Sequence, residues 1–526
     1  MYAVAALILW ALLLFLAPPA QNAFWGVNGL RSVTLPVAAG LVAAALLAAL
    51  ATACNPRSRA LAAVVTLALA ALLAFAMREK LHMLGDTTTR RGAIITFTGG
   101  AVHRPLDEWA RDLHAQPLDL MLGLVLTSQL SRALHSVILG VSVVSFLLGL
   151  VYLAGAWRLA RRLTAGSEPE WGLWLALVAW GGAQAFAGYA ESAGVTLAVA
   201  VWWWGSMLSP LARPQDSAIL VTTWALVALA HRTGLLLLVP LALRLLGPPL
   251  AGDQPGVRRA ALVGTAIAVL AIVIAGLRAV DTQLVRDARE LLRLPAPDTW
   301  RSLPTDLLNL LALSAPLAIL APLLAGREGL RRFFADARTR ILLVAALPLL
   351  PLVWPLPVAG NGLGVHRDWD LSALLGLTLT IAGACLLASL PVARRRAALT
   401  LIVPLLVLGA GGWVAVNADG RASLDRVAAL AEGEPALGDG QRSSLYLFYG
   451  SRLLESGDPA SAARVLVASW ELVPSPSRGF HAAIACMRAG DLESARRVLT
   501  AVRERPGLTS GQIATADRLL RQASAR

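Results

Sequence analysis

Long apolar runs separated by short polar segments fill the chain from residue 3 to residue 416. A helix needs about 20 apolar residues to cross the hydrocarbon core of a bilayer, and runs near this length recur throughout the region. The predicted fold class is therefore all-α, a polytopic bundle of about thirteen transmembrane helices. Read in order, the predicted spans cover residues 3–17, 33–53, 60–77, 134–156, 171–190, 192–208, 217–231, 234–248, 260–279, 305–325, 341–358, 371–391 and 399–416.

Three segments in this region need a separate interpretation. The run 118–134 is less apolar and carries Ser128, Ser131 and Arg132, which predicts an amphipathic helix in the outer interface. The polar stretch 231–234 interrupts the apolar run from 217 to 248, so a hairpin of two short helices is predicted there. The first run has no basic segment before it and is interpreted as an uncleaved span, with a cleaved signal peptide as the alternative.

Arginine in the short loops falls mainly on one side of this topology. The short outside loops hold only Arg31, Arg232 and Arg367, while two longer outside segments, 78–116 and 280–304, contain basic residues and nearly as many acids. Because basic residues in short loops mark the cytoplasmic side, we expect a multi-pass protein of the cytoplasmic (inner) membrane with its C-terminal domain outside. The predicted inside loops carry Arg57, Arg59, Arg158, Arg161, Arg162, Arg213, Arg258, Arg259, Arg327, Arg331, Arg332, Arg338, Arg340, Arg394, Arg395 and Arg396.

Composition agrees with lipid as the solvent of this chain. Charged residues make up 15% of it, whereas a soluble domain carries about 25%. The formal net charge of +14 would suit nucleic acid, but the arginines lie in short clusters between apolar runs, so no nucleic-acid partner is predicted. The three cysteines, Cys54, Cys385 and Cys486, predict neither a disulfide framework nor a metal site.

The last hundred residues have a different pattern and contain an internal repeat. Gly457-Asp458 recurs 33 residues later as Gly490-Asp491, and the residues that follow each pair are also alike. A helical hairpin of this period is typical of tetratricopeptide repeats, and an irregular helical bundle is the alternative. We therefore predict a membrane domain over 1–416, a linker over 417–440 and a small α-solenoid over 441–526.

Two lone acids lie in predicted outside loops. Asp86 follows Gly85 early in the long loop after the third span, and Glu191 follows Tyr189-Ala190 between the fifth and sixth spans. A carboxylate at an outer membrane surface can act as a general base or bind a metal ion. The alternatives are a solvated aspartate after a glycine turn and a glutamate at a helix end reaching water.

Two further groups of ionisable residues lie on the same side. His231 and Arg232 occupy the tip of the predicted hairpin, where an arginine can clamp a phosphate with two hydrogen bonds, or the pair can simply extend to the interface. The stretch from His366 to Asp370 precedes the twelfth span. Its two acids could share a divalent cation, or Arg367 could neutralise them.

Convergence of these groups is stronger evidence than any one of them. Ionisable residues at membrane depth are costly and usually functional, and these come from four separate loops on one side. A membrane-embedded site open to the outside explains them together. A transporter would place such residues nearer the bilayer midplane.

The arrangement resembles the C-type (GT-C) membrane glycosyltransferases. The resemblance lies in Gly85-Asp86 early in a long first outer loop, the interfacial helix after it, and the stretches FAGYAES, AHRTGLLLLVP and HRDWDLSA. These stretches are similar to segments of bacterial GT-C-like proteins that end in tetratricopeptide repeats. The resemblance covers the thirteen spans and the tail.

The resemblance implies a transferase that moves a sugar from a polyprenyl-phosphate donor to an acceptor outside the membrane. Asp86 would be the catalytic base that deprotonates the acceptor hydroxyl. Membrane lipid and the lipid-linked donor would be partners, and the repeats could bind a protein. The remaining residues would bind substrate: Arg232 and Arg367 on the donor phosphate, Glu191, Asp368 and Asp370 on acceptor or on a divalent cation such as Mg²⁺ or Mn²⁺, with His231 and His366 beside them.

Two other classes of function fit parts of the pattern. A polysaccharide polymerase or O-antigen ligase also has many spans and sometimes a repeat tail, but its large outer loop usually lies late in the chain. A transporter, or an envelope assembly protein that binds partners through the repeats, would need no catalytic base. A transporter predicts symmetry between halves and acids at mid-span, and neither is visible in this sequence.

Overall fold

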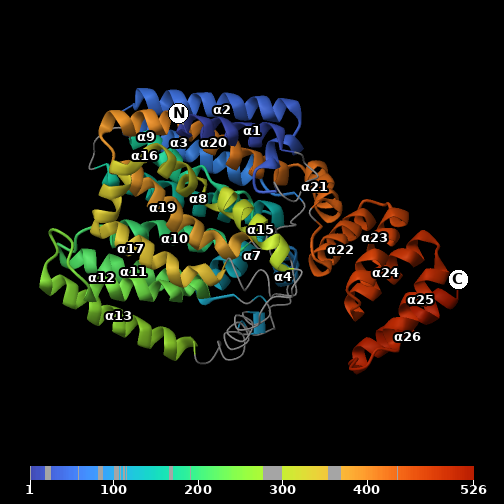
Figure 1. Cartoon of the computed structure of the whole chain (residues 1–526). Helices are drawn as coiled ribbons and strands as arrows, with labels where there is room; N and C mark the ends of the chain where they lie inside the picture. The colour runs from blue at the N-terminus through green and yellow to red at the C-terminus, as the bar shows by residue number, and fades with distance from the viewer. Residues whose placement is uncertain are drawn as a thin grey trace.

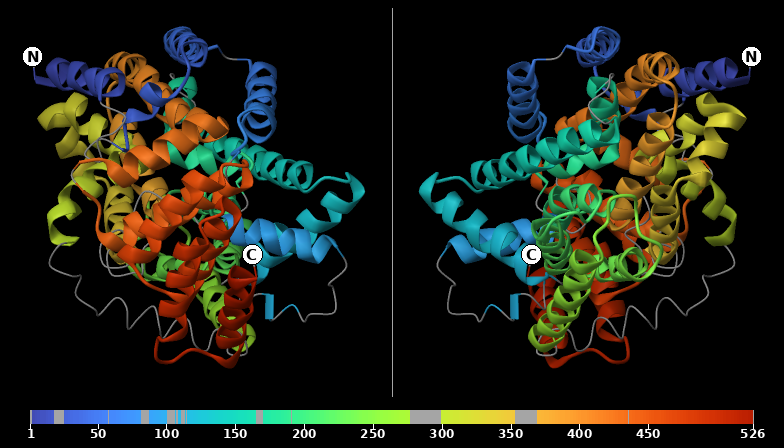
Figure 2. Two further views of the ribbon diagram at one scale, coloured as in Figure 1. Left: turned by 90° about the vertical axis from the view of Figure 1, so that its right-hand side faces the viewer. Right: turned by 90° about the vertical axis from the view of Figure 1, so that its left-hand side faces the viewer.

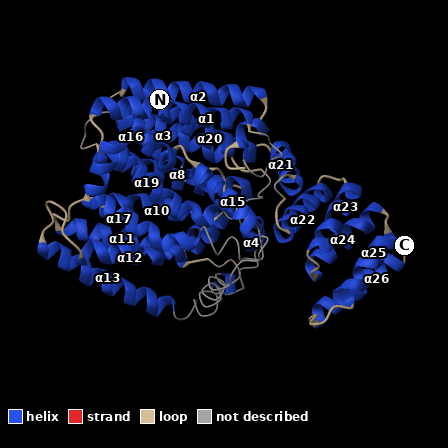
Figure 3. Cartoon of the chain, viewed as in Figure 1, coloured by secondary structure: helices blue, strands red, loops and turns tan. Residues whose placement is uncertain are grey.

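A computed structural model of the chain shows a helical body followed by a helical tail (Figure 1). It describes residues 2–17, 25–56, 58–80, 87–99, 106, 108–109, 113, 115–164, 170–189, 191–276, 299–352, 369–434 and 436–525. Every regular element in these ranges is a helix (Figure 3), which confirms the all-α prediction for the part of the chain described.

The body contains both long helices and short or irregular ones. In chain order they are α1 (Tyr2–Leu16), η2 (Asn28–Ser32), α2 (Leu35–Cys54), α3 (Arg59–Ala71), η3 (Leu72–Ala76), α4 (Thr87–Thr98), α6 (Pro117–Asp119), η4 (Leu120–Leu126), α7 (Thr127–Ala133), α8 (Val137–Leu163), α9 (Glu170–Val178), η5 (Gly181–Phe186), α10 (Ser192–Met207), α11 (Pro214–Ala230), η6 (Arg232–Leu237), α12 (Leu238–Leu246), α13 (Pro255–Gly276), α15 (Thr299–Ser314), α16 (Pro316–Ala335), α17 (Ala337–Ala346), η7 (Leu347–Leu352), η8 (Trp369–Ser372), α19 (Ala373–Ala388) and α20 (Val392–Ala418).

Six helical segments among the described residues are long and apolar enough to cross a membrane. They are Leu35–Cys54, Arg59–Ala76, Val137–Leu163, Pro255–Ile272, Trp369–Ala388 and Val392–Ala418. A seventh candidate is a bent pair, in which Pro304–Ser314 meets Pro316–Ala335 at 82°. These helices support the prediction of a multi-pass membrane protein, while the count of thirteen spans stays a prediction.

Several predicted spans are broken by local backbone chemistry. The span predicted at 171–190 is not one helix, because α9 ends at Val178 and Trp180 is extended, with φ −147° and ψ 171°. At Gly181 a Cβ would lie 2.6 Å from Cγ of Leu313, so only glycine allows this close approach. The bend between α15 and α16 falls at Ala315, where the following proline disfavours helical backbone.

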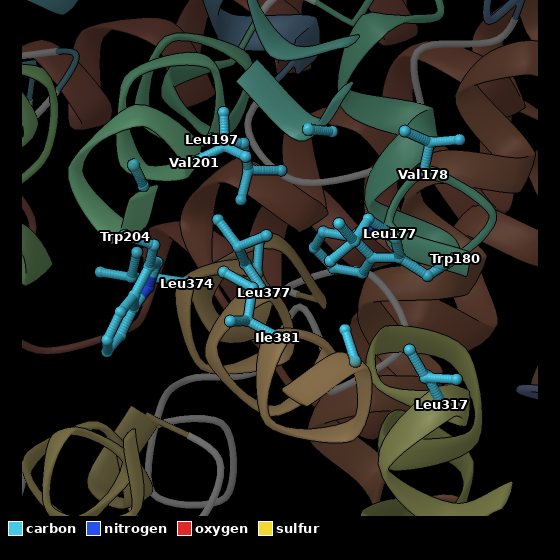
Figure 4. Packing of buried hydrophobic residues seen from close by; sticks show 14 of the residues in the cluster. Leu177, Val178, Trp180, Leu197, Val201, Trp204, Leu317, Leu374, Leu377 and Ile381 are labelled. Atoms are coloured by element: carbon cyan, nitrogen blue, oxygen red, sulfur yellow. The ribbon is translucent and has the colours of Figure 1, made fainter. Parts of the chain in front are cut away.

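Helix α19 occupies the centre of the body. Leu374, Leu377 and Ile381 on α19 point toward Leu197, Val201 and Trp204 of α10 on one side and toward Leu177, Trp180 and Leu317 on the other (Figure 4). All nine of these side chains are fully buried. A helix that is apolar on every face needs such an all-round packing environment.

The two ends of the body carry different polar groups. In Figure 1, α4, α7, α21 and the tail lie toward the right-hand end, and the α12–α13 connection lies at the left. We call the right-hand end the outer end, because its loops are those predicted to face outside. At the other end Arg244 forms a fully buried two-bond pair with Asp253, at 2.6 Å and 2.7 Å, which ties together two connections predicted to lie inside.

The predicted linker contains a helix that is packed on the body. Helix α21 (Gly420–Glu432) follows α20, and Arg426 on it donates to the carbonyl oxygen of Trp25 at 2.5 Å. Its guanidinium carbon also lies 4.6 Å from the ring centroid of Trp413. Part of the predicted linker is therefore an ordered helix that is packed on the body.

The repeated residues of the tail have the same local structure in both copies. Gly457 and Gly490 have left-handed backbone, with φ of 87° and 81°. Asp458 and Asp491 then cap the next helix by accepting a hydrogen bond at 3.0 Å from the third residue after each. The solenoid itself stays a prediction. The tail helices are α22 (Asp439–Glu455), α23 (Pro459–Leu472), α24 (Pro476–Ala489), α25 (Leu492–Arg503) and α26 (Ser510–Ser524).

Candidate functional site

A buried arginine joins three distant segments at the outer end. Arg90, on the first half of α4, lies between Asp119 at the end of α6 and Glu191 just before α10. Its Nη1 is 2.8 Å from Oδ2 of Asp119, and its Nε is 2.7 Å from Oε2 of Glu191. All three residues are at least nine-tenths buried, so the three charges form one compact polar cluster.

Helix α4 is held at its other end by a second arginine. Arg132 on α7 donates through Nη2 to the carbonyl oxygen of Phe97 at 2.6 Å, and through Nε to that of Thr98 at 3.1 Å. These carbonyls are the unpaired acceptors at the C-terminus of a helix. Ala93 and Ile94 bury one face of α4 against the helix that runs from 117 to 133. The position of α4 is thus fixed by contacts along its whole length.

The segment predicted as an interfacial helix is helical, and the two serines that the prediction used are buried. Residues 117–133 form one run of α6, η4 and α7, whose middle part is a π-helix. Ser128 and Ser131 are buried, and a Cβ on Gly140 of α8 would lie 2.2 Å from Oγ of Ser131. The glycine at 140 therefore allows α8 to approach Ser131 closely. Figure 2 shows this part of the chain on the flank opposite to α1.

His231 begins the short helix η6 at the tip of the predicted hairpin. Its Nδ1 accepts the backbone N–H of Thr233 at 3.3 Å and lies 2.7 Å from Oγ1 of the same residue. With Nδ1 as acceptor, the proton of the neutral ring is on Nε2.

Tyr189 joins the last predicted group to this cluster. It is 3% exposed. Its ring centroid is 5.9 Å from that of Trp369, the residue before Asp370. This ring contact places the segment before Glu191 beside the start of η8, which carries Asp370.

Of the predicted site residues, the structure pairs Glu191 with Arg90, and the contact of Tyr189 with Trp369 joins the segment before Glu191 to the segment of Asp370. His231 and Arg232 lie at the start of η6. Glu191 was predicted to bind substrate. In the structure its carboxylate is paired with Arg90 of the protein itself. The predicted residues Asp86, His366, Arg367 and Asp368 lie outside the described residues.

The sequence analysis did not predict Arg90, Asp119 or Glu79 as site residues. It named Tyr189 only as a neighbour of Glu191. Asp119 carried a signal, since it is a lone acid within the apolar run QPLDLMLGL. Arg90 carried little, because it lies in a long loop that also contains other charges. The described residues contain no group of three or more His, Cys, Asp or Glu that could hold a metal ion.

Comparisons of the chain with family models, with curated proteins and with solved structures find no match. The class of protein is therefore argued from the apolar helices and from this buried polar cluster.

The geometry of His231 allows its two nitrogens to be tested separately. In His231→Asn, the side-chain oxygen can still accept the N–H of Thr233, but the donor at the Nε2 position is lost. In His231→Gln, a donor at that position is kept and the cap is lost. If Nε2–H serves a ligand, we expect Gln to retain most activity and Asn to lose about tenfold or more. Both are measured by in vivo complementation with protein amounts matched.

The same two variants, His231→Asn and His231→Gln, distinguish a helix-capping role of His231 from a ligand-binding role. A purely structural His231 would give the reverse order, with Asn close to wild type and Gln lowered in both thermal stability and activity. That reverse order would remove His231 from the set of ligand-binding residues.

Proposed function

We propose that the chain is a membrane glycosyltransferase that moves a sugar from a polyprenyl-phosphate donor to an acceptor on the outer side of the membrane. The observation that carries the proposal is the buried polar cluster at one end of an apolar helical body. Arg90 within this cluster lies on α4, whose first residue, Thr87, directly follows Asp86.

The chemistry of the cluster suits a reaction between a charged lipid and a sugar acceptor. Buried ionisable groups in a membrane protein are costly and are kept mainly for function. Asp86 is assigned as the general base, and Arg232 with Arg367 as the contacts of the donor phosphate. Asp370 and the phenol of Tyr189 provide one acceptor and one donor for sugar hydroxyls, the pairing that carbohydrate recognition needs.

Glu191 is assigned a different role from the substrate binding that was predicted for it. Because its carboxylate is 2.7 Å from Nε of Arg90, its charge is already paired. We assign it to holding Arg90 and α4 in place, and leave acceptor binding to Asp370, with Asp368 as a second candidate.

The finer topology belongs to the same proposal. Thirteen spans place the cluster, the tail and Asp86 on the outer side of the cytoplasmic membrane. The tail would be a tetratricopeptide-type solenoid, and such solenoids bind proteins or peptides on their concave surface.

The experiment that tests the function compares the lipid-linked sugars of a null strain with those of the complemented strain. A glycosyltransferase predicts that a polyprenyl-phosphate monosaccharide accumulates in the null strain and that an envelope glycan loses one sugar. Accumulation of a longer lipid-linked oligosaccharide would favour a polymerase or ligase. Unchanged lipid-linked sugars and unchanged glycan would overturn the proposal.

A further inference from the structure

A narrow cleft at the outer end has one charged wall and one apolar wall. It lies between the chain that leaves α3, the first half of α4 and the start of α8, and Gly188 also borders it. The charged wall is formed by Arg78, Glu79 and Arg91. The apolar wall is formed by Val137, Ile138 and Val141.

The charged wall has an excess of positive charge. Among the described residues, neither Arg78 nor Arg91 forms an ion pair with a carboxylate, and Nε of Arg91 is buried without a hydrogen-bond partner. Within the described ranges, the side chain of Arg78 donates to the carbonyl oxygen of Phe75, at 2.6 Å. Glu79 contributes one negative charge, so the wall carries a net charge of +1. Partly buried arginine without a counter-charge is costly and favours an anion as ligand.

Local backbone chemistry keeps Arg78 in this position. Gly188 has a φ of +62°, and a Cβ there would lie 2.7 Å from Cβ of Arg78. Any other residue at 188 would be strained and would push Arg78 away from the wall. The glycine is therefore part of how the cleft is built.

A second polar group in the cleft also lacks a partner. Ser142 on α8 lines the cleft and is 1% exposed. Its hydroxyl has no hydrogen-bond partner within the ranges that the structure describes. Serine inside a helix commonly bonds to the carbonyl four residues earlier, so this hydroxyl is left available to a ligand in the cleft.

The apolar wall continues onto a surface suited to hydrocarbon. Ile138 in the cleft and Leu139 beside it are 42% and 41% exposed, and Leu147 and Val151 further along α8 are exposed to a similar degree. Helix α8 is one of the six candidate membrane spans. A ligand with an anionic group at the cleft would therefore have its chains beside an apolar helix face.

We infer that this cleft binds the phosphodiester head group of an anionic membrane phospholipid, held by Arg78, Arg91 and Ser142, with its acyl chains along α8. A phosphodiester carries one negative charge, which matches the net charge of the wall. Arginine binds phosphate oxygens with two parallel hydrogen bonds. The inference does not depend on the proposed glycosyltransferase activity.

The test is native mass spectrometry of the full chain in detergent, titrated with phosphatidylglycerol or with phosphatidylcholine of the same acyl chains. We expect phosphatidylglycerol to bind more tightly. Arg78→Gln and Arg91→Gln should each weaken it by about tenfold or more, the effect of losing hydrogen bonds to a charged group. Arg78→Lys and Arg91→Lys keep the charge and should lose less. The matched control is Arg59→Gln, an exposed arginine at the other end of α3, which should not change binding.

Each other outcome overturns the inference. Equal losses in the Arg59 control would show a non-specific effect of positive charge. Unchanged binding in the Arg78 and Arg91 variants would show that the cleft is not the site. Complete displacement by glycerol phosphate, which has no acyl chains, would assign the site to a soluble phosphate. If Arg78→Gln does not fold, Arg91→Gln and the lysine variants decide the question.

Discussion

Replacing Asp86 by asparagine is expected to lower turnover by about 10²–10⁴-fold, the usual contribution of general-base catalysis. Asparagine keeps the size and polarity of the side chain but cannot accept the proton of an acceptor hydroxyl. Since the donor phosphate is assigned to arginines, donor binding should persist. The measurement is restoration of the envelope glycan in a null strain, with transfer rates measured in membranes from the same cells.

The matched control is Asp336→Asn at the opposite end of the body. Asp336 is exposed and caps α17 through its side chain, which asparagine can also do. We expect that variant to behave as wild type. An Asp86→Asn protein that is made in normal amounts and restores the glycan fully would remove the catalytic assignment, and the proposed function would lose its main support.

Replacing Arg90 by methionine is expected to destabilise the protein by about 3–5 kcal/mol, because Asp119 and Glu191 would be left buried without their counter-charge. The expected effect is large because Asp119 and Glu191 are 1% and 8% exposed. The free energy of unfolding is measured by denaturant titration in a fixed detergent, and thermal unfolding gives a second estimate.

Two further variants show whether the cause is the unpaired charge. Arg91→Gln, one residue away and without a carboxylate partner within the described ranges, leaves Arg90 between Asp119 and Glu191 and should not cause this loss of stability. Converting all three residues to apolar ones, as Arg90→Met, Asp119→Leu and Glu191→Met together, should recover most of the loss, since no buried charge remains. If Arg90→Met alone is as stable as wild type, the ion cluster does not fix α4.

Under the proposed function, the cluster would help to keep the loop that carries Asp86 in a precise position. Arg90 and Arg132 hold the two ends of α4, and Glu191 and Asp119 come from segments that contact the core of the body. A site on a loop needs such supporting contacts to keep its geometry. This gives Glu191 and Arg132 indirect functions that would be seen as reduced activity together with reduced stability.

Part of this protein was determined by its sequence alone. Apolar runs near the span length require helices in a membrane, because every backbone group must be hydrogen-bonded internally, and six such helices are found in the part of the chain that the structure describes. The repeat of Gly457-Asp458 at Gly490-Asp491 also acts locally, since a left-handed glycine and an aspartate cap depend only on neighbouring residues. Periodicity and capping are short-range properties, and they can be predicted from a single chain.

Only the tertiary structure decided which charges meet. Arg90 is 29 residues from Asp119 and 101 from Glu191, and no local pattern links the three. The buried state of Ser128 and Ser131, and the break at Gly181, likewise depend on Gly140 and on Leu313 of another segment. The energy of a buried charge depends on its partner and on its distance from water. Both are set by how distant helices pack, so the polar cluster could be expected at the outer end but not assigned residue by residue.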